Sequence, residues 1–229
     1  MKKIVFLVMV LAAGSAFAMS FDAAGYEPAG LDELDKRKGG FKTTLVNPGV
    51  DFSRYTKIHQ RKVVLVIDTS GKAVNDFETG RLFTKRERET VVPEFDEIVE
   101  FKRIVSDAIT EELGHLDGVD QVESEGPGTL IIQPVITEVE ISSSSKNRSS
   151  EGRELPVLKE GMIVFDLLDA ESGEIVARFA ESRRCKAPKG AKKAAGAWPN
   201  LPFWAEGAAA DLRQELAREQ IAGADPEQS

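Results

Sequence analysis

An uninterrupted apolar run, Val63-Val64-Leu65-Val66-Ile67, is the sequence feature that most constrains the fold of this chain. Side chains alternate between the two faces of a strand, so a run without alternation predicts burial on both faces. Such a strand needs a sheet that is covered on both sides, or at least well packed. We therefore expect this run to be a central strand of the sheet.

A helix is predicted over residues 93–113, directly before Gly114. Apolar residues recur there at intervals of three or four and form one stripe: Ile98, Phe101, Val105, Ile109 and Leu113. Pro93 suits the first turn of a helix, and the acidic residues that follow it favour the positive end of the helix dipole. Gly114 is a typical helix stop.

Strands are predicted in the second half of the chain. Residues 129–141 alternate, and Pro134 inside them favours an edge position or a bulge. One face would carry Leu130, Ile132 and Ile136, and the other Ile131, Val135, Val139 and Ile141. Residues 142–160 are of low complexity and are predicted to form a loop. Residues 162–168 and 174–182 are predicted to pair as a hairpin.

The composition of residues 203–221, rich in Ala, Glu, Leu and Arg, predicts a second helix. The resulting order predicts an α+β fold, an α/β sandwich in which two main helices pack on an open mixed sheet of about four to five strands. We expect one domain over residues 42–221, a flexible N-terminal arm over 19–41 and a disordered tail over 222–229.

The N-terminal residues 1–18 have the pattern of a bacterial signal peptide, with Lys2 and Lys3, a short apolar stretch and Ala16-Phe17-Ala18 as cleavage site. The alternative is an N-terminal membrane anchor, for which the apolar stretch is short. The only cysteine is Cys185, so a mature N-terminal cysteine that could carry a lipid is missing. The pattern predicts a periplasmic or secreted protein with no transmembrane segment after cleavage.

The formal net charge of −8 opposes binding to nucleic acid or to an anionic membrane surface. A single cysteine cannot form an internal disulfide. Neighbouring cations would lower the thiol pKa of Cys185 if it were exposed, and an exposed thiol could also pair between chains. We favour a cysteine buried at the end of the predicted hairpin.

A search for catalytic or metal-binding patterns is negative. His59 and His115 lack the spacing of metal ligands. The serines 142–145 have no nucleophile elbow around them, and Gly126-Pro127-Gly128 has no phosphate-binding lysine pattern. The carboxylates are explained by solvated surfaces and by the helix dipole. The sequence therefore predicts no catalytic residue, no metal, no cofactor and no enzymatic activity.

A basic stretch departs from the acidic average of the chain: Arg183, Arg184, Lys186, Lys189, Lys192 and Lys193. It can contact an anionic partner, or it can be a solvated loop. Trp198, Phe203 and Trp204 follow it, and we favour their role as the anchor of the final helix over an exposed patch. The candidate partner contact consists of the six cations with Trp198 and Trp204.

The stretch VNPGVDFSRYTKI, residues 46–58, is the most distinctive one in the chain. Pro48-Gly49 is predicted to reverse the chain direction. Phe52 and Tyr55 would then pack against the margin of the sheet. The polar residues Asp51, Ser53 and Arg54 would satisfy backbone groups of the turn or pair locally. We interpret the stretch as a structural lead-in to the sheet and not as a catalytic loop.

This stretch, with the apolar run after it, resembles the opening of a bacterial envelope family that is catalogued as domain of unknown function 3313. Many members of that family are lipoproteins. Residues 126–130 and 136–139 are similar to its middle, and residues 161–174 to its hairpin. The resemblance implies a small α/β envelope domain without established catalytic residues, here without the lipid-bearing cysteine.

Together, these patterns predict a non-catalytic accessory or protein-interaction module of the bacterial envelope, with another envelope protein as its partner. The alternative is a periplasmic small-ligand-binding protein that uses a cleft between sheet and helix.

Overall fold

The computed structural model describes residues 31–33, 40–68, 73–74, 93–187, 189–190 and 197–223. The predicted signal peptide, most of the predicted arm, and Lys192 and Lys193 lie outside the described residues.

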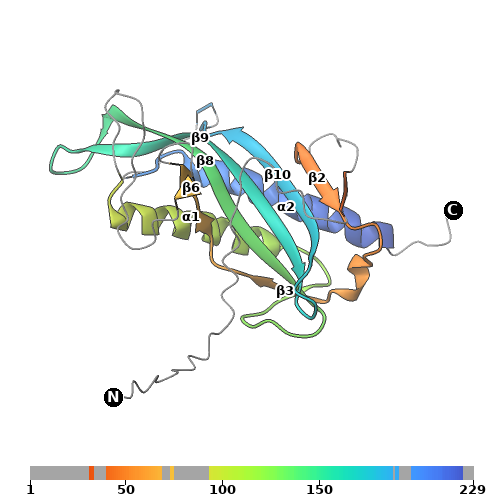
Figure 1. Ribbon diagram of the computed structural model, residues 1–229. Helices are drawn as coiled ribbons and strands as arrows, with labels where there is room; N and C mark the ends of the chain where they lie inside the picture. Colours follow the sequence, from red (N-terminus) through yellow and green to blue (C-terminus); the bar gives the residue numbers. More distant parts are fainter. Residues whose placement is uncertain are drawn as a thin grey trace, which may run out of the picture.

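The chain forms an open mixed sheet with two helices on one face, which confirms the predicted α+β fold (Figure 1). The helices are α1 (Phe95–Leu113) and α2 (Leu201–Gly223). In the described residues the strand order is β1 (Asp32–Glu33), β2 (Thr43–Val46), β10 (Ile175–Arg184), β9 (Glu154–Asp169), β8 (Thr129–Arg148), β3 (Lys57–Gln60) and β7 (Asp120–Gln121). Strand β4 (Val64–Leu65) also pairs with β8. The sheet thus has eight described strands, more than the four to five predicted, and five of them have four or more residues.

The centre of the sheet is the antiparallel meander β8–β9–β10, to which β3 adds in parallel. The sheet face toward the helices carries Ile132, Leu167 and Ala177, which are register neighbours on the three strands. They belong to one continuous apolar core with residues of both helices. The two helices therefore owe their position to this face of the sheet.

The predicted apolar stripe of α1 is confirmed. Phe101, Val105, Ile109 and Leu113 are buried, and Ile98 is half-buried. The helix begins after Glu94, whose backbone N–H donates to the Glu97 carboxylate at 2.8 Å, so Pro93 precedes the first turn. Gly114 caps the C-terminal end, as predicted.

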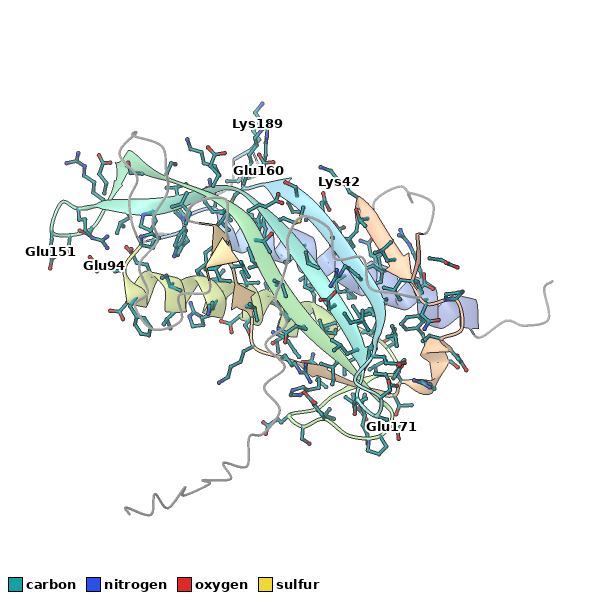
Figure 2. The ribbon with its side chains drawn as sticks, viewed as in Figure 1. Lys42, Glu94, Glu151, Glu160, Glu171 and Lys189 are labelled. Carbon is teal, nitrogen blue, oxygen red and sulfur yellow. The ribbon has the colours of Figure 1, made fainter. Side chains whose placement is uncertain are left out.

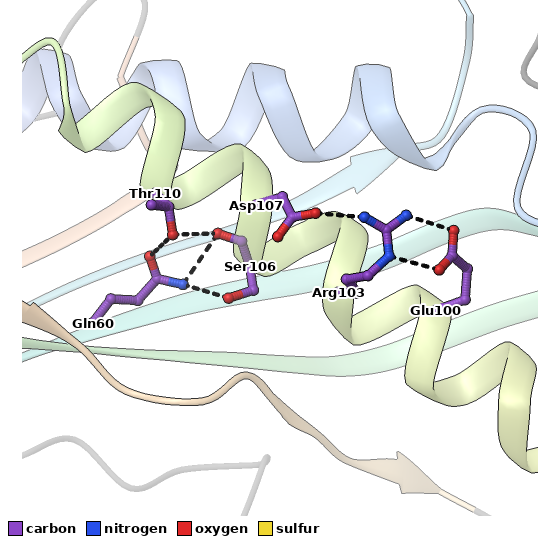
Figure 3. Close-up of polar contacts among 6 residues, drawn as sticks. All are labelled: Gln60, Glu100, Arg103, Ser106, Asp107 and Thr110. Carbon is purple, nitrogen blue, oxygen red and sulfur yellow. Dashed lines mark hydrogen bonds and ion pairs between the residues drawn. The ribbon is translucent and has the colours of Figure 1, made fainter. Parts of the chain in front are cut away.

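Polar side chains of α1 form hydrogen bonds with Gln60 of β3 and ion pairs with one another along the exposed side of the helix (Figure 3). Gln60 Nε2 donates to Ser106 Oγ at 2.9 Å, and Thr110 Oγ1 donates to Gln60 Oε1 at 3.0 Å. Arg103 forms ion pairs with Glu100 at 2.7 Å and Asp107 at 2.6 Å. The Gln60 contacts hold β3 against the helix, whereas the Arg103 ion pairs lie within α1.

The prediction that Val63–Ile67 forms a central strand is wrong. Only Val64–Leu65 pair with β8, and β5 (Ile67–Asp68) pairs with β6 (Ala73–Val74) in a separate two-stranded sheet. The run still buries side chains on both faces, because Val63 belongs to the main core and Val66 packs with Val135 and Val164 on the opposite face. The paired part of the run lies on the outer side of β8, because β9 pairs with the other side of β8.

The prediction of a loop over residues 142–160 is also wrong. Strand β8 continues to Arg148, and β9 begins at Glu154, so most of this segment forms the outer part of a long hairpin. Leu155 and Leu158 are buried, which extends β9 beyond its predicted start. A serine-rich segment can form this hairpin because the hydrogen bonds between its two strands come from the backbone and not from the side chains.

A bulge in β8 changes which face its later residues occupy. The register shifts between Thr137 and Glu140, and Glu138 has a φ of 51°. An extra residue moves every later side chain to the other face. Val139 and Ile141 therefore pack against the main core, whereas Val135 lies on the opposite face, contrary to the predicted alternation.

The prediction of an edge position or a bulge at Pro134 holds only locally, because β8 lies inside the sheet and its register shifts begin after Thr137. The pairing of β3 with β8 ends at Ile132, and the pairing of β4 with β8 begins at Val135. Pro134 lies opposite the break between them, where no ladder donor is required.

Candidate functional site

The predicted basic stretch begins on the last residues of β10, where the strand leaves the sheet. Arg184 projects into solvent with 71% of its side chain exposed, and its Nε lies 3.4 Å from a carboxylate oxygen of Glu160 on β9. Lys186 and Lys189 follow and are exposed. Three of the six predicted cations therefore lie on an accessible surface.

Arg183 points to the other side of the strand and belongs to the fold. It forms an ion pair with Glu181 at 2.9 Å and another with Asp211 of α2. Burial lowers the pKa of Arg183, and the carboxylates of Glu181 and Asp211 outweigh this effect and raise it. Its charge is thus neutralised within the chain and is not offered to a partner.

Two further cations join the exposed ones through strand pairing. Lys159 is exposed on β9, and its carbonyl accepts the backbone N–H of Cys185 at 2.7 Å. Lys42 is exposed at the start of β2, and its ammonium donates to the carbonyl of Ser182 at 3.2 Å. No local sequence pattern indicates either lysine, because each is far along the chain from the basic stretch.

We call the resulting surface the cationic rim, defined as Lys42, Lys159, Arg184, Lys186 and Lys189. Figure 2 shows Lys42 and Lys189 on the same side of the molecule, with Glu160 between them. Glu160 accepts a hydrogen bond from Ser182 Oγ at 3.1 Å besides its contact with Arg184. The rim therefore has an excess of positive charge on a chain whose formal net charge is −8.

The two tryptophans are packing residues. The indole N–H of Trp198 donates to the carbonyl of Glu97 at 2.6 Å, and its ring meets Phe101 edge to face at 5.0 Å. The indole N–H of Trp204 donates to the carbonyl of Arg183 at 2.9 Å. Both side chains are buried, which confirms their role as an anchor of α2 and removes them from any exposed patch.

Cys185 is buried, as we favoured from the sequence, and it is a free thiol. Burial raises its pKa to about 12, so the neighbouring cations do not activate it.

The stretch 46–58 is a structural lead-in, as predicted. Asp51 caps the short helix η1 (Phe52–Arg54), accepting from Ser53 N at 2.9 Å and Ser53 Oγ at 2.6 Å. Phe52 and Tyr55 are buried, with ring centroids 6.1 Å apart.

Tyr55 and Arg54 also hold the turn between β9 and β10. The Tyr55 hydroxyl donates to Asp169 Oδ2 at 2.9 Å, and Arg54 forms an ion pair with the same carboxylate. Asp169 Oδ1 accepts the backbone N–H groups of Glu171 and Ser172 at 3.0 and 2.7 Å. Every oxygen of this carboxylate is used by the fold, so the cluster is a turn clamp.

Among the side chains that the structure describes, no group of three or more His, Cys, Asp or Glu residues is arranged to hold a metal ion. In the same part of the chain, no helix is both long and apolar enough to span a membrane.

The fold and the surface thus define a class: a two-layer α+β domain with a group of exposed cations at one end of its sheet. No family model matches the sequence, and no curated protein matches it significantly. Membership in the family of unknown function that the motifs resemble stays a prediction.

Solved structures of similar fold come from bacteria. A PelC dodecamer from Paraburkholderia phytofirmans is 11% identical, with a TM-score of 0.35, and the match covers 74% of this chain and 95% of that one. Protein XCC0632 from Xanthomonas campestris, of the DUF330 family, is 12% identical with a TM-score of 0.36, covering 80% and 94%. A putative neuraminyllactose-binding hemagglutinin homolog from Helicobacter pylori is 10% identical with a TM-score of 0.34, covering 82% and 94%.

Proposed function

We propose that this chain is an extracytoplasmic protein of the bacterial envelope that binds an acidic partner protein through the cationic rim and has no catalytic activity. The observation that carries the proposal is the rim itself. Five exposed cations lie at one end of the sheet of an acidic chain: Lys42 just before β2, Lys159 on β9, Arg184 at the end of β10, and Lys186 and Lys189 in the loop after it. Such a local excess attracts and orients a partner of opposite charge.

The distribution of the other charges supports a contact role for the rim. Arg54, Arg103 and Arg183 are each paired with carboxylates inside the fold. The rim lysines Lys159, Lys186 and Lys189 form no ion pair with any described residue. Exposed charges that the fold does not use are the ones available to a partner, and a protein partner fits better than an anionic membrane because the net charge of the chain is negative.

The test is crosslinking in the cell, with a photo-reactive residue at Lys186 or Lys189 and mass spectrometry of the captured proteins. A recurrent envelope partner should be captured from these positions and not from Lys57 or Lys62, which are exposed on β3 and in the loop after it.

A charge-reversal variant makes the test specific. With the photo-reactive residue at Lys186, Lys42→Glu, Lys159→Glu and Lys189→Glu together should abolish capture, whereas Lys57→Glu with Lys62→Glu should preserve it. Equal capture by both variants would show that the rim does not bind the partner.

A further inference from the structure

An arginine of β10 meets a carboxylate of β9 at two levels of the sheet. Arg178 lies opposite Asp166, and Arg184 lies opposite Glu160. The register between these two levels is unbroken, so all four side chains lie on the sheet face that points away from α1 and α2. The two pairs therefore share their backbone geometry and differ in their surroundings.

The pair in the middle of the sheet is a complete contact. The Arg178 guanidinium donates from Nε to Asp166 Oδ1 at 2.5 Å and from Nη2 to Asp166 Oδ2 at 2.9 Å. Both side chains are buried. A guanidinium that binds a carboxylate with two parallel N–H groups makes the strongest kind of ion pair, and this pair belongs to the fold.

The pair at the cationic rim is open to solvent and incomplete. The Arg184 Nε lies 3.4 Å from Glu160 Oε2, which is longer than a charge-assisted hydrogen bond. The side chains of Arg184 and Glu160 are 71% and 38% exposed. An exposed ion pair is weak, because water screens both charges. A carboxylate from outside the chain can therefore compete with Glu160 for the guanidinium.

A second donor faces the same carboxylate. The Ser182 hydroxyl donates to Glu160 Oε1 at 3.1 Å, and the Lys42 ammonium donates to the Ser182 carbonyl at 3.2 Å. Glu160 lies between Lys42 and Lys189 at this end of the molecule (Figure 2). The centre of the cationic rim thus holds a carboxylate that belongs to the chain itself.

We infer that Glu160 is an internal competitor of the partner: it contacts Arg184 in the free protein, and a carboxylate of the acidic partner replaces it on binding. The inference rests on the proposed function, since it names the contact residue and the competing group of the same surface. Arg184 exchanges one carboxylate for another, so the exchange alone gains little free energy.

This competition makes Glu160 a specificity-determining residue. A partner with one isolated carboxylate gains little, because it must displace Glu160 and is repelled by it. A partner segment with several closely spaced Asp or Glu residues gains further contacts with Lys186 and Lys189, which are exposed beside Arg184 in the chain. The rim therefore selects a segment with a high density of carboxylates.

The test is the fluorescence anisotropy of a short labelled poly-L-glutamate peptide, titrated with the purified chain at low salt. Glu160→Gln should tighten binding about two- to fivefold, the range expected when a weak exposed ion pair no longer competes. The amide oxygen of the variant can still accept the Ser182 hydroxyl, so the local structure is kept. The gain should shrink as added salt screens the charges.

Glu140→Gln is the matched control. Glu140 is exposed and lies opposite Glu160 on β8, one strand further from Arg184, so its loss changes the net charge equally without releasing the guanidinium. A double-mutant cycle isolates the contact itself. In an Arg184→Gln background, Glu160→Gln should tighten binding no more than Glu140→Gln does in the wild-type chain. Thermal melts of each variant establish that it is folded.

The outcomes separate this inference from the proposed function. An equal gain from Glu140→Gln and Glu160→Gln, or a Glu160→Gln gain that persists without Arg184, overturns the inference, because net charge alone then explains the gain. Unchanged affinity in Glu160→Gln, or no peptide binding at all, overturns it as well. If an envelope protein is still captured through Lys186 in these cases, the proposed function stands. A chain that neither binds the peptide nor captures a partner overturns both.

Discussion

Arg178 lies directly opposite Asp166 across β10 and β9, and its guanidinium donates to the carboxylate twice, Nε to Oδ1 at 2.5 Å and Nη2 to Oδ2 at 2.9 Å. Both residues are buried on the sheet face that points away from α1 and α2. A buried charge that loses its partner is costly, whereas replacing both partners by apolar residues is often tolerated.

We expect Asp166→Asn to lower the free energy of unfolding by about 3–5 kcal/mol, because it leaves the Arg178 charge buried without its carboxylate. The double variant Asp166→Leu with Arg178→Met should cost clearly less than this single change. Urea unfolding of the three proteins measures the difference. Equal losses for the single and double variants would contradict an uncompensated charge as the cause.

The hydrogen bond of Trp198 can be separated from its packing. Trp198→Phe keeps an aromatic ring against Phe101 and removes the donor to the Glu97 carbonyl, which should cost about 1–3 kcal/mol. Trp198→Ala also removes the buried ring and should cost about 3–5 kcal/mol. Chemical denaturation measures both, and Phe203→Ala, at a half-buried neighbouring position, is the control. A Trp198→Ala loss no larger than that of the control would argue against the anchor.

The clamp on the β9–β10 turn makes stability depend on pH. Burial raises the pKa of Asp169, but the Ser172 N–H, the Tyr55 hydroxyl and Arg54 outweigh this and lower it below its usual value. The group is more acidic when folded, so its contribution is present above the unfolded pKa of about 4 and is lost as pH falls through the folded pKa. The Asp169→Asn variant should therefore be less stable than wild type at pH 7, and the gap should narrow in acid. Thermal melts over this pH range check it; a constant gap would show that the carboxylate charge is not responsible.

Tyr55, directly after η1, holds the same turn through its hydroxyl. Tyr55→Ala should lower stability by about 2–4 kcal/mol through loss of a buried ring, and Tyr55→Phe by about 1–2 kcal/mol through loss of the hydroxyl donor to Asp169. Thr56→Ala is a nearby exposed control. An unchanged melting temperature for Tyr55→Ala would show that the ring is not structural.

Cys185 should be inert in the folded protein. With a pKa raised to about 12 by burial, only a minute fraction of the thiol is ionised at pH 8, and the sulfur is shielded as well. We expect no reaction with a thiol reagent until denaturant is added, and a single band on a non-reducing denaturing gel. A dimer band that disappears with reductant would contradict the burial.

The alternative of a small-ligand carrier stays a prediction, and native mass spectrometry of the purified chain for a bound small molecule would test it.

The local sequence pattern was sufficient to predict those helices and strands whose own side chains define a buried face. The stripe of α1, the pairing of residues 162–168 with 174–182, and the second helix follow from spacing and composition, because each element supplies its own periodicity. The packing of Phe52 and Tyr55 followed in the same way from aromatic residues beside a turn.

The sequence pattern was insufficient where the choice of pairing strand, or the register of that pairing, determines the structure. The face of Val139 depends on a bulge at Glu138, and the length of β8 depends on the strand opposite it. Lys42 and Lys159 join the cationic rim only because β2, β9 and β10 are neighbours in the sheet. No window of the sequence contains these relationships.

The sequence by itself determined the fold class, the two helices, the acidic character of the chain and the presence of one basic stretch, since these are properties of composition and of short-range periodicity. Only the tertiary structure decided which cations are free, that both tryptophans are buried, and that Glu140, Glu160 and Arg184 form one row. The reason is physical: burial and charge pairing are set by contacts between segments that are distant along the chain, and strand register decides which side chains meet.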